Sequence, residues 1–387
     1  MLWRIIFQVI SVCAWAYAVV VVVRPMRLGR KWTAVLSALF AAAFAKFAFF
    51  AVAGGHSFNP ELPQLAIWAY GWAYGSAMLL LAFATAALAA DGALLLAGRP
   101  ASLRFRRIRT CALAAAAAAT AAWGIYEGVR VPAVNRVEIG FEGLPPAFDG
   151  YRIVHLSDIH CSTAMRRERV ERIVEKVNGL GADMIAITGD FVDGHVKDRR
   201  DDMAPLALLR AKDGVVACTG NHEAYWDWKG WREALLGFGL VFPEMSGPVV
   251  VRRHADAIAV GGMEDPAFSG TSPPVFAHDA GDCFAGAPED AFRVLLCHRP
   301  LTGQIRADDP AAGIRLMLSG HTHGGAMPVL SILVSLTNEG HVRGLYQFAP
   351  GRHLHVAPGT GQWAGFPLRL FNPTEITEII LRRDNGR

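Results

Sequence analysis

The chain has 387 residues, more than one ordinary domain needs, and 52% of them are hydrophobic. This share, with a positive mean hydropathy, excludes a wholly soluble protein and predicts that part of the chain lies in lipid. Basic residues greatly outnumber acidic ones before residue 130, whereas the remainder is mildly acidic, so the formal net charge of +4 conceals two different parts. An acidic remainder argues against nucleic acid as a partner of that part.

Four apolar stretches in the first third of the chain predict membrane spans. Residues 5–23 carry no charge and are long enough to cross a bilayer core of about 30 Å. A cleaved signal peptide is the alternative for this stretch, but the further apolar stretches and the lack of a convincing cleavage site favour a span. We therefore predict a transmembrane anchor over residues 1–130, with spans at about 5–23, 33–53, 65–90 and 111–126.

Loop charge predicts the orientation of these spans. Residues 24–31 and 99–109 are rich in Lys and Arg, which places both loops on the cytoplasmic side and everything after residue 127 outside the cytoplasm. Binding of nucleic acid or anionic lipid is the alternative for the second loop. Lys46 lies inside the second span near its outer end, and we expect its amine to snorkel to the interface. A functional role for this lysine is the alternative.

The remainder of the chain predicts one large domain after a linker. Residues 131–149 look like a linker with an edge strand, and residues 150–387 like the domain itself. Apolar runs ending near residues 156, 188 and 218 alternate with helical patterns, which is typical of an α/β core with parallel strands. Ligands of such a core bind beyond the carboxyl ends of its strands.

Potential metal ligands follow five of the apolar runs. They are Asp158 and His160, then Asp190, then Asn221 and His222, then His298, and finally His321 and His323. Carboxylate or amide oxygens combined with several imidazoles suit Mn, Fe, Zn or Co better than Mg or Ca. One shared carboxylate would hold two such ions about 3.5–4 Å apart, so the pattern predicts a dinuclear site.

Five motifs, in this order, resemble those of the calcineurin-like metallophosphoesterases. They are SDIH (157–160), GDFVD (189–193), GNHE (220–223), CHRP (297–300) and GHTHGG (320–325). The resemblance covers residues 150–383 and implies two mixed β-sheets sandwiched between helices. The C-terminal stretch is similar to a membrane-anchored bacterial subgroup, which includes phosphodiesterases and UDP-2,3-diacylglucosamine pyrophosphatases of lipid A biosynthesis.

The resemblance also implies a role for each residue. Asp158, His160 and His323 would bind the first metal, Asp190 would bridge, and Asn221, His298 and His321 would bind the second. A metal-bridging hydroxide would attack a phosphodiester or pyrophosphate bond, and His222 would be the catalytic group facing the phosphate. Asp193 and Glu223 would orient imidazoles from a second layer, or else cap turns.

An aromatic run follows GNHE and bears on the substrate. Tyr225, Trp226, Trp228 and Trp231 are candidates to face a lipid, and the alternative is that they pack on the domain's own helix. We therefore predict a phosphohydrolase of a bacterial inner (plasma) membrane, multi-pass, with an extracytoplasmic catalytic domain and a lipid-linked substrate. A UDP-linked lipid A precursor is one such substrate, although it conflicts with that orientation because it belongs in the cytoplasm.

The rival hypothesis is a different class of protein. Under this hypothesis, the chain is a membrane transport or signalling protein whose soluble domain only binds metal or nucleotide.

Overall fold

The computed structural model describes residues 2–268, 280–302 and 313–384. It divides into two compact units. The helical unit contains Met1–Gly128 together with Ala364–Leu370, and the sheet unit contains Val129–Trp363 together with Phe371–Arg387. A short late segment of the chain, Ala364–Leu370, thus groups with the N-terminal helices.

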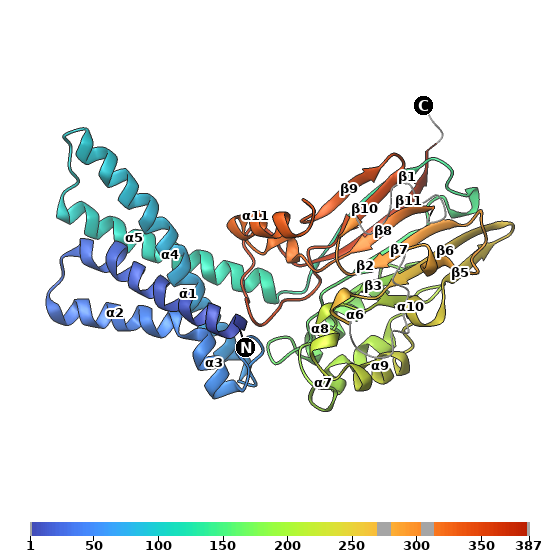
Figure 1. Ribbon diagram of the computed structural model, residues 1–387, viewed down its shortest axis with the longest axis horizontal. Helices are drawn as coiled ribbons and strands as arrows, with labels where there is room; N and C mark the ends of the chain where they lie inside the picture. Colours follow the sequence, from blue (N-terminus) through green and yellow to red (C-terminus); the bar gives the residue numbers. More distant parts are fainter. Residues whose placement is uncertain (1, 269–279, 303–312, 385–387) are drawn as a thin grey trace. The chain divides into compact units, whose positions relative to one another are not determined.

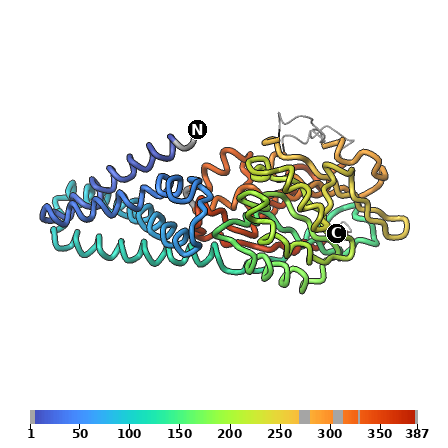
Figure 2. Tube along the Cα trace, turned by 90° about the horizontal axis from the view of Figure 1, so that it is seen from below, coloured from blue at the N-terminus to red at the C-terminus, as the bar shows by residue number. Residues whose placement is uncertain are grey.

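The helical unit is built from long apolar helices, which Figure 2 traces in blue and teal. The first is α1 (Leu2–Ala18), which continues through η1 (Val19–Val23) and η2 (Arg24–Met26). The others are α2 (Arg30–Phe44), α3 (Lys46–Gly54), α4 (Gln64–Leu96) and α5 (Leu103–Val129). The helical conformation satisfies the backbone hydrogen bonds of these segments internally, as a bilayer requires.

Three of these helical stretches are long and apolar enough to cross a membrane: Ile5–Met26, Gln64–Leu96 and Leu103–Val129. They contain the predicted spans 5–23, 65–90 and 111–126. The predicted span 33–53 falls on α2 and α3, which are bent by 59° at Ala45 and would make a fourth crossing only if the pair counts as one span. The predicted number of four is thus an upper value.

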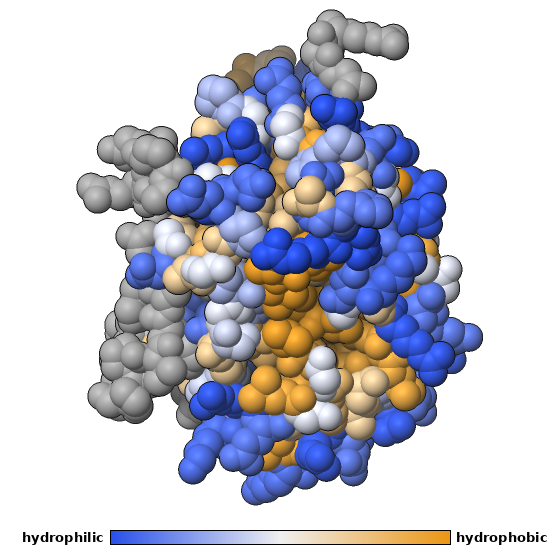
Figure 3. All heavy atoms as spheres, turned by 90° about the vertical axis from the view of Figure 1, so that its right-hand side faces the viewer, coloured by the Kyte–Doolittle hydropathy of each residue, from blue (hydrophilic) through white to orange (hydrophobic). Residues whose placement is uncertain are grey.

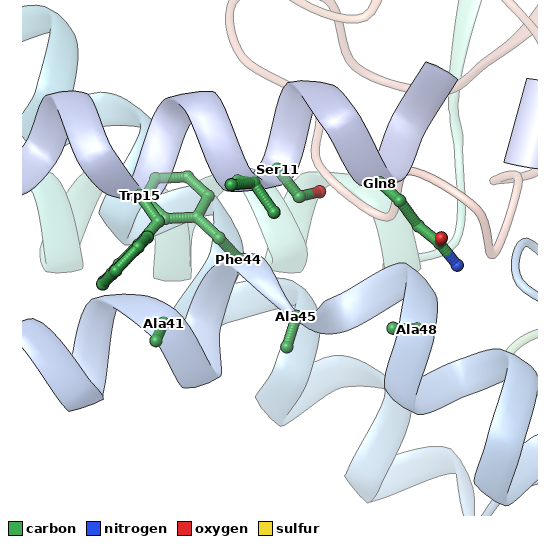
Figure 4. A pocket seen from close by; sticks show the side chains of 8 residues that line it. Gln8, Ser11, Trp15, Ala41, Phe44, Ala45 and Ala48 are labelled. Carbon is green, nitrogen blue, oxygen red and sulfur yellow. The ribbon is translucent and has the colours of Figure 1, made fainter. Parts of the chain in front are cut away.

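A groove lies beside this bend. Gln8, Ser11 and Trp15 of α1 face Ala41, Ala45 and Ala48 across a space of about 350 Å³ (Figure 4). Lys46, the residue after the bend, is fully buried. The expected snorkelling of Lys46 to the interface is therefore wrong, because its amine is enclosed by protein.

The sheet unit contains two mixed sheets (Figure 1). The first has the order β1-β11-β2-β3-β4, formed by β1 (Ala133–Phe141), β11 (Glu375–Arg383), β2 (Arg152–Leu156), β3 (Met184–Thr188) and β4 (Val215–Cys218). The second has the order β5-β6-β7-β8-β10-β9. Its strands are β5 (Val249–Arg253), β6 (Asp256–Met263), β7 (Phe292–Cys297), β8 (Ile314–Ser319), β10 (Arg352–Val356) and β9 (Gly344–Ala349).

The sheet unit also has shorter helices. They are α6 (Arg167–Asn178), α7 (Val196–Met203), α8 (Asn221–Tyr225), α9 (Trp228–Gly237), α10 (Pro243–Ser246) and α11 (Pro328–Thr337). Short 3-10 turns connect several elements: η3 (Pro146–Phe148), η4 (Ala204–Leu208), η5 (Pro266–Phe268), η6 (Asp282–Phe284) and η8 (His323–Gly325).

Apolar side chains form a core between the two sheets and another on the outer face of the first. The inner core joins residues such as Ile153 and Met184 of the first sheet to Val294 and Leu316 of the second. The outer core joins the first sheet to apolar residues of α6 and α9, including Trp231. Hydrophilic residues surround a central apolar strip on the face seen in Figure 3. Together the cores hold the strand ends that carry the candidate ligands.

Replacing Trp231 by Ala tests the outer core. Its ring is fully buried and its Nε1 donates to the Gly194 carbonyl at 2.9 Å. Loss of a buried aromatic ring leaves a cavity, so we expect Trp231→Ala to lower the free energy of unfolding by about 3–5 kcal/mol. Urea unfolding of the detergent-solubilised protein measures the change. Tyr225→Ala, at a ring that is 62% exposed, is the control and should change it little.

Candidate metal centre

The candidate ligands gather because parallel strands end together. In the first sheet β2 pairs with β3 and β3 with β4, all parallel, and in the second β7 pairs parallel with β8. Each strand is followed at once by one or two of the predicted ligands: Asp158 and His160, Asp190, Asn221, His298, and His321 and His323. Neighbouring parallel strands bring their carboxyl ends to one edge, which is where such folds bind ligands.

The backbone at these positions is unusual. Asp158, His160, Asp190, His321 and His323 all have positive φ, between 46° and 68°. This left-handed region costs a residue with a Cβ roughly 1–2 kcal/mol. Such strain persists only where the surrounding structure enforces it and is commonly found at functional sites. Here it turns each side chain out of its strand direction and toward the others.

The first group of candidate ligands contains Asp158, His160 and His323, whose ligand atoms all lie within 4.8 Å of one another. The Nε2 atoms of His160 and His323 are 3.0 Å apart, and the Oδ1 atom of Asp158 is 3.5 Å from His323 Nε2. Ligand atoms about 2.0–2.3 Å from a shared ion would have separations of this order.

The second group contains Asp190, His298 and His321. His298 Nε2 lies 3.2 Å from Asp190 Oδ2 and 3.3 Å from His321 Nδ1. The same oxygen of Asp190 is 3.7 Å from His160 Nε2, in the first group. Asp190 therefore stands between the two groups, where a bridging carboxylate would have to be.

The residues present suit two metal ions. Asn221 is buried, and its Oδ1 has no hydrogen-bond partner, which is costly unless a ligand supplies one. The Nδ1 of His298 lies 2.7 Å from the carbonyl of Thr188, an arrangement in which Nδ1 donates. Nε2, which is 3.2 Å from Asp190 Oδ2, is then the nitrogen that would bind a metal in place of its proton. Imidazole nitrogens with carboxylate and amide oxygens match the borderline divalent metals expected from the sequence.

Asp193 holds two imidazoles at once. Its carboxylate oxygens accept from Nδ1 of His160, at 3.1 Å, and from Nδ1 of His222. Burial opposes ionisation of Asp193, but the charges of these two imidazoles outweigh it and hold the pKa of the carboxyl below its usual range. Asp193 thus contacts the two imidazoles that it would orient.

The protonation of His222 follows from the same acids. Burial lowers the pKa of His222, but the carboxylates of Asp190 and Asp193 outweigh burial and raise the pKa to about 9. Nε2 of His222 lies 3.9 Å from Asp190 Oδ2, and the side chain is 16% exposed, unlike the fully enclosed His160. His222 therefore lies beside the second group on the solvent side and carries a proton at neutral pH.

Glu223 caps a turn, which is the second of the two roles considered for it. Its carboxylate accepts hydrogen bonds from the backbone N–H groups of Gly220, Asp190 and Phe191, at 2.7, 3.1 and 2.7 Å. Burial, with the nearby Asp190, raises the pKa of Glu223 to about 7. It therefore ties the loop after β4 to the loop after β3 through their backbones, rather than holding an imidazole.

The aromatic run divides into buried and exposed members. Trp231 is fully buried, so its proposed contact with lipid is wrong. Trp226 and Trp228 are partly buried against the outer core, where Trp228 also contacts Phe268 at a ring distance of 5.1 Å. Only Tyr225 is largely exposed, with its ring 5.4 Å from that of His222.

Other described residues at the centre lie outside the five motifs. The ring of Trp363 lies 6.1 Å from that of His222. Asn372 donates from Nδ2 to the carbonyl of His323 at 3.0 Å. Gly361 donates to the carbonyl of Asp158 at 2.9 Å, and a Cβ there would collide with the backbone of Ile159. Two signals in the sequence point here: the run PGTG at 358–361, and the C-terminal stretch that is similar to the bacterial subgroup.

A two-sheet sandwich with paired ligand groups at its strand ends defines a metallophosphoesterase-type domain, and comparison with known proteins agrees. The family model described as calcineurin-like phosphoesterase matches residues 151–325. An uncharacterized metallophosphoesterase of Helicobacter pylori is 31% identical over 262 residues, which cover 68% of this chain and 67% of the relative. This chain belongs to the calcineurin-like metallophosphoesterase family.

Two animal relatives are described as transmembrane proteins that contain a metallophosphoesterase domain. A zebrafish (Danio rerio) protein called transmembrane protein with metallophosphoesterase domain is 35% identical over 269 residues, covering 69% of this chain and 61% of the relative. Its cattle (Bos taurus) counterpart is 34% identical over 266 residues, covering 67% and 59%. The match thus spans about three fifths of these relatives, and together with the apolar helices it suggests membrane association.

Replacing Asp193 by Asn tests the arrangement around the first group. The amide keeps the shape but loses the charge that holds His160 and His222, so we expect Mn²⁺ to bind about 10–100-fold more weakly. Calorimetric titration of the metal-free protein measures the affinity. Asp198→Asn, at an exposed site on α7, is the matched control. Equal affinity of the Asp193 variant and the native protein would contradict the arrangement.

The pH dependence of metal binding tests the second group. Burial lowers the pKa of His298, but Asp190 outweighs burial and raises it to about 10, whereas burial and His298 lower the pKa of His321 to about 3. At neutral pH the metal must displace one proton from His298 and none from His321. Because the folded-state pKa is raised, apparent affinity should rise about tenfold per pH unit between pH 6 and pH 8. Calorimetry in buffers of different ionisation enthalpy should then detect the released proton. A metal affinity that does not change between pH 6 and pH 8 would contradict the displacement of a proton from His298.

Proposed function

We propose that the chain is a metal-dependent phosphohydrolase that cleaves a phosphodiester or pyrophosphate bond. The observation that carries the proposal is the position of Asp190, which lies between two groups of ligands at the ends of parallel strands. Two ions bound by these groups would supply a water nucleophile and neutralise the charge of the phosphate. The rival hypothesis of a transport or signalling protein does not need the second group to lie so close to the first.

The protein's own residues have distinct tasks in this reaction. His222, protonated at neutral pH and partly exposed, faces the position that a phosphate would occupy beside Asp190, and donates its proton to the leaving oxygen. Asp193 keeps the His222 ring oriented for that transfer. Glu223 and Gly220 fix the turn on which Asn221 and His222 stand.

We further propose that the substrate is lipid-linked, as the sequence predicted. The support lies in α11, which starts two residues after the η8 turn that carries His323. Ile332, Leu333 and Leu336 of this helix are 64%, 59% and 77% exposed. Large apolar side chains at such spacing form one exposed face, which suits a bilayer surface or an acyl chain better than water.

The helix is closely attached to the metal-binding loop. The Ser331 hydroxyl of α11 lies within 3.5 Å of the Gly324 carbonyl, and a Cβ on Gly325 would lie 2.5 Å from the Cα of Ser331. An apolar chain bound along the exposed face of α11 would therefore have its head group near the ligands that follow β8.

The location that we propose is a bacterial inner membrane, with the catalytic domain outside the cytoplasm. It rests on the two basic loops, 24–31 and 99–109, and on the apolar helices. The narrower assignment to a UDP-linked lipid A precursor has no contact in the described residues to support it. An envelope phosphodiester with acyl chains fits the proposed side of the membrane better.

Hydrolysis of two substrates tests both parts of the proposal. The full-length protein with Mn²⁺ should hydrolyse bis(4-nitrophenyl) phosphate in solution and a phospholipid diester in vesicles. Asp190→Ala should abolish both activities. Replacing Leu333 and Leu336 together by Glu should reduce turnover of the vesicle substrate at least tenfold, since each Leu loses about 1.5–3 kcal/mol of burial, and should spare the soluble one.

The control for the double Glu variant of α11 is Leu208→Glu, at an apolar residue that is 57% exposed on another part of the sheet unit. It should leave both activities unchanged. Equal loss of both activities in the α11 variant would mean that the helix only supports the fold. Absence of hydrolysis by the native protein with any of the four metals would overturn the proposed activity itself.

A further inference from the structure

A seven-residue segment of the chain belongs to the helical unit although the residues on both sides of it belong to the sheet unit. This segment, Ala364–Leu370, is here called the docking segment. The chain leaves the sheet unit after Trp363 and enters it again at Phe371. A segment that leaves and rejoins its own domain must be held by specific contacts, since ordering it has an entropic cost.

Lys46 provides the first of these contacts. Its Nζ donates to the carbonyl of Gly365 at 2.6 Å. The same nitrogen lies 4.7, 5.1 and 5.4 Å from the ring centroids of Phe47, Phe50 and Tyr74. A lysine within an apolar membrane segment is costly to bury and is a candidate for a functional role. The carbonyl and the three aromatic faces together replace the solvation that Lys46 has lost.

Helix glycines make room for the docking segment. A Cβ on Gly71 of α4 would lie 2.6 Å from Cγ of Pro367, and a Cβ on Gly124 of α5 would lie 2.7 Å from Cδ1 of Leu368. The carbonyl of Gly124 also accepts a hydrogen bond from the backbone N–H of Arg369, at 3.0 Å. These glycines let backbone and segment approach closely, as small residues do at helix interfaces in membranes.

Residues that flank the docking segment on either side are hydrogen-bonded to loops of the metal centre. On one side, Gly361 donates to the carbonyl of Asp158 at 2.9 Å. On the other side, Asn372 donates from Nδ2 to the carbonyl of His323 at 3.0 Å. Only three residues separate Gly361 from Gly365, so the chain between these two anchors is short.

We propose that Lys46 is a positioning residue of the metal centre. By fixing the docking segment in the helical unit, it fixes Gly361 and Asn372, and through them the loops that carry Asp158 and His323. The helical unit is then a working part of the enzyme and not only its anchor. Loss of the Lys46 contact releases the segment and loosens the first group of ligands.

The main test replaces Lys46 by Met, which keeps most of the volume and removes the donor. The full-length protein in lipid nanodiscs is titrated with Mn²⁺ alone, and hydrogen exchange is followed in residues 360–372. We expect about tenfold weaker binding of Mn²⁺, the lower range found when a group that supports a ligand is removed. Faster exchange in the docking segment and at Gly361 should accompany it, with a matching fall in kcat/KM for bis(4-nitrophenyl) phosphate.

Two further variants test the role of the docking segment if Lys46→Met does not fold. Gly71→Val places a side chain against Pro367 and should have the same effects on metal affinity and exchange. Gly92→Val, on the same helix with no atom within 4 Å of the added Cβ, should have neither effect. Exchange that increases in the docking segment while the affinity for Mn²⁺ stays unchanged would overturn the proposal.

This inference uses the proposed phosphohydrolase function only for its activity measurement. Metal affinity and hydrogen exchange need no substrate. If the native protein binds Mn²⁺ but hydrolyses neither ester, the proposed function fails while the role of Lys46 is still decided by the two binding measurements.

Discussion

The carboxylate of Asp190 is the interaction on which the rest of the site depends. One of its oxygens lies between His160 of the first ligand group and His298 of the second, and the other accepts the backbone N–H of His222. Glycines at 189 and 220 leave the space that this carboxylate and its neighbours occupy. The two sheets, their parallel strands and the strained loops that follow them hold one acid in contact with three imidazole-bearing loops.

Much of the candidate site could be predicted from the sequence, because its ligands follow the ends of strands. Parallel strands share an edge, so a sequence in which neighbouring apolar runs end in Asp158 and Asp190 already indicates that these two side chains meet. His298 follows β7 of the other sheet and meets them because the two sheets pack face to face. The two-sheet arrangement came from the resemblance to a family and is observed. The packing of the aromatic run was harder to predict from the sequence, because a helical period of 3.6 residues does not say which ring faces a core. Trp231 is buried, whereas Tyr225 is exposed.

Contacts between distant parts of the chain could not be predicted. Lys46 and Gly365 are 319 positions apart, and neither has a pattern around it that names the other. The same is true of Asn372, whose amide supports the loop of His323 from 49 positions away. A lysine in an apolar stretch has two physical solutions, reaching water or finding a carbonyl, and only the folded chain distinguishes them.

The docking segment has a consequence for how this protein can be divided. Cutting the chain after α5 would yield a fragment that keeps both sheets and every candidate ligand, and such a fragment looks like an independent enzyme. It would nevertheless carry Phe366, Pro367, Leu368 and Leu370 without the helices that receive them. Those four apolar residues, interrupted only by a buried arginine, would then face water. The helical unit is therefore incomplete in any fragment that ends at α5, because part of it comes from residues 364–370.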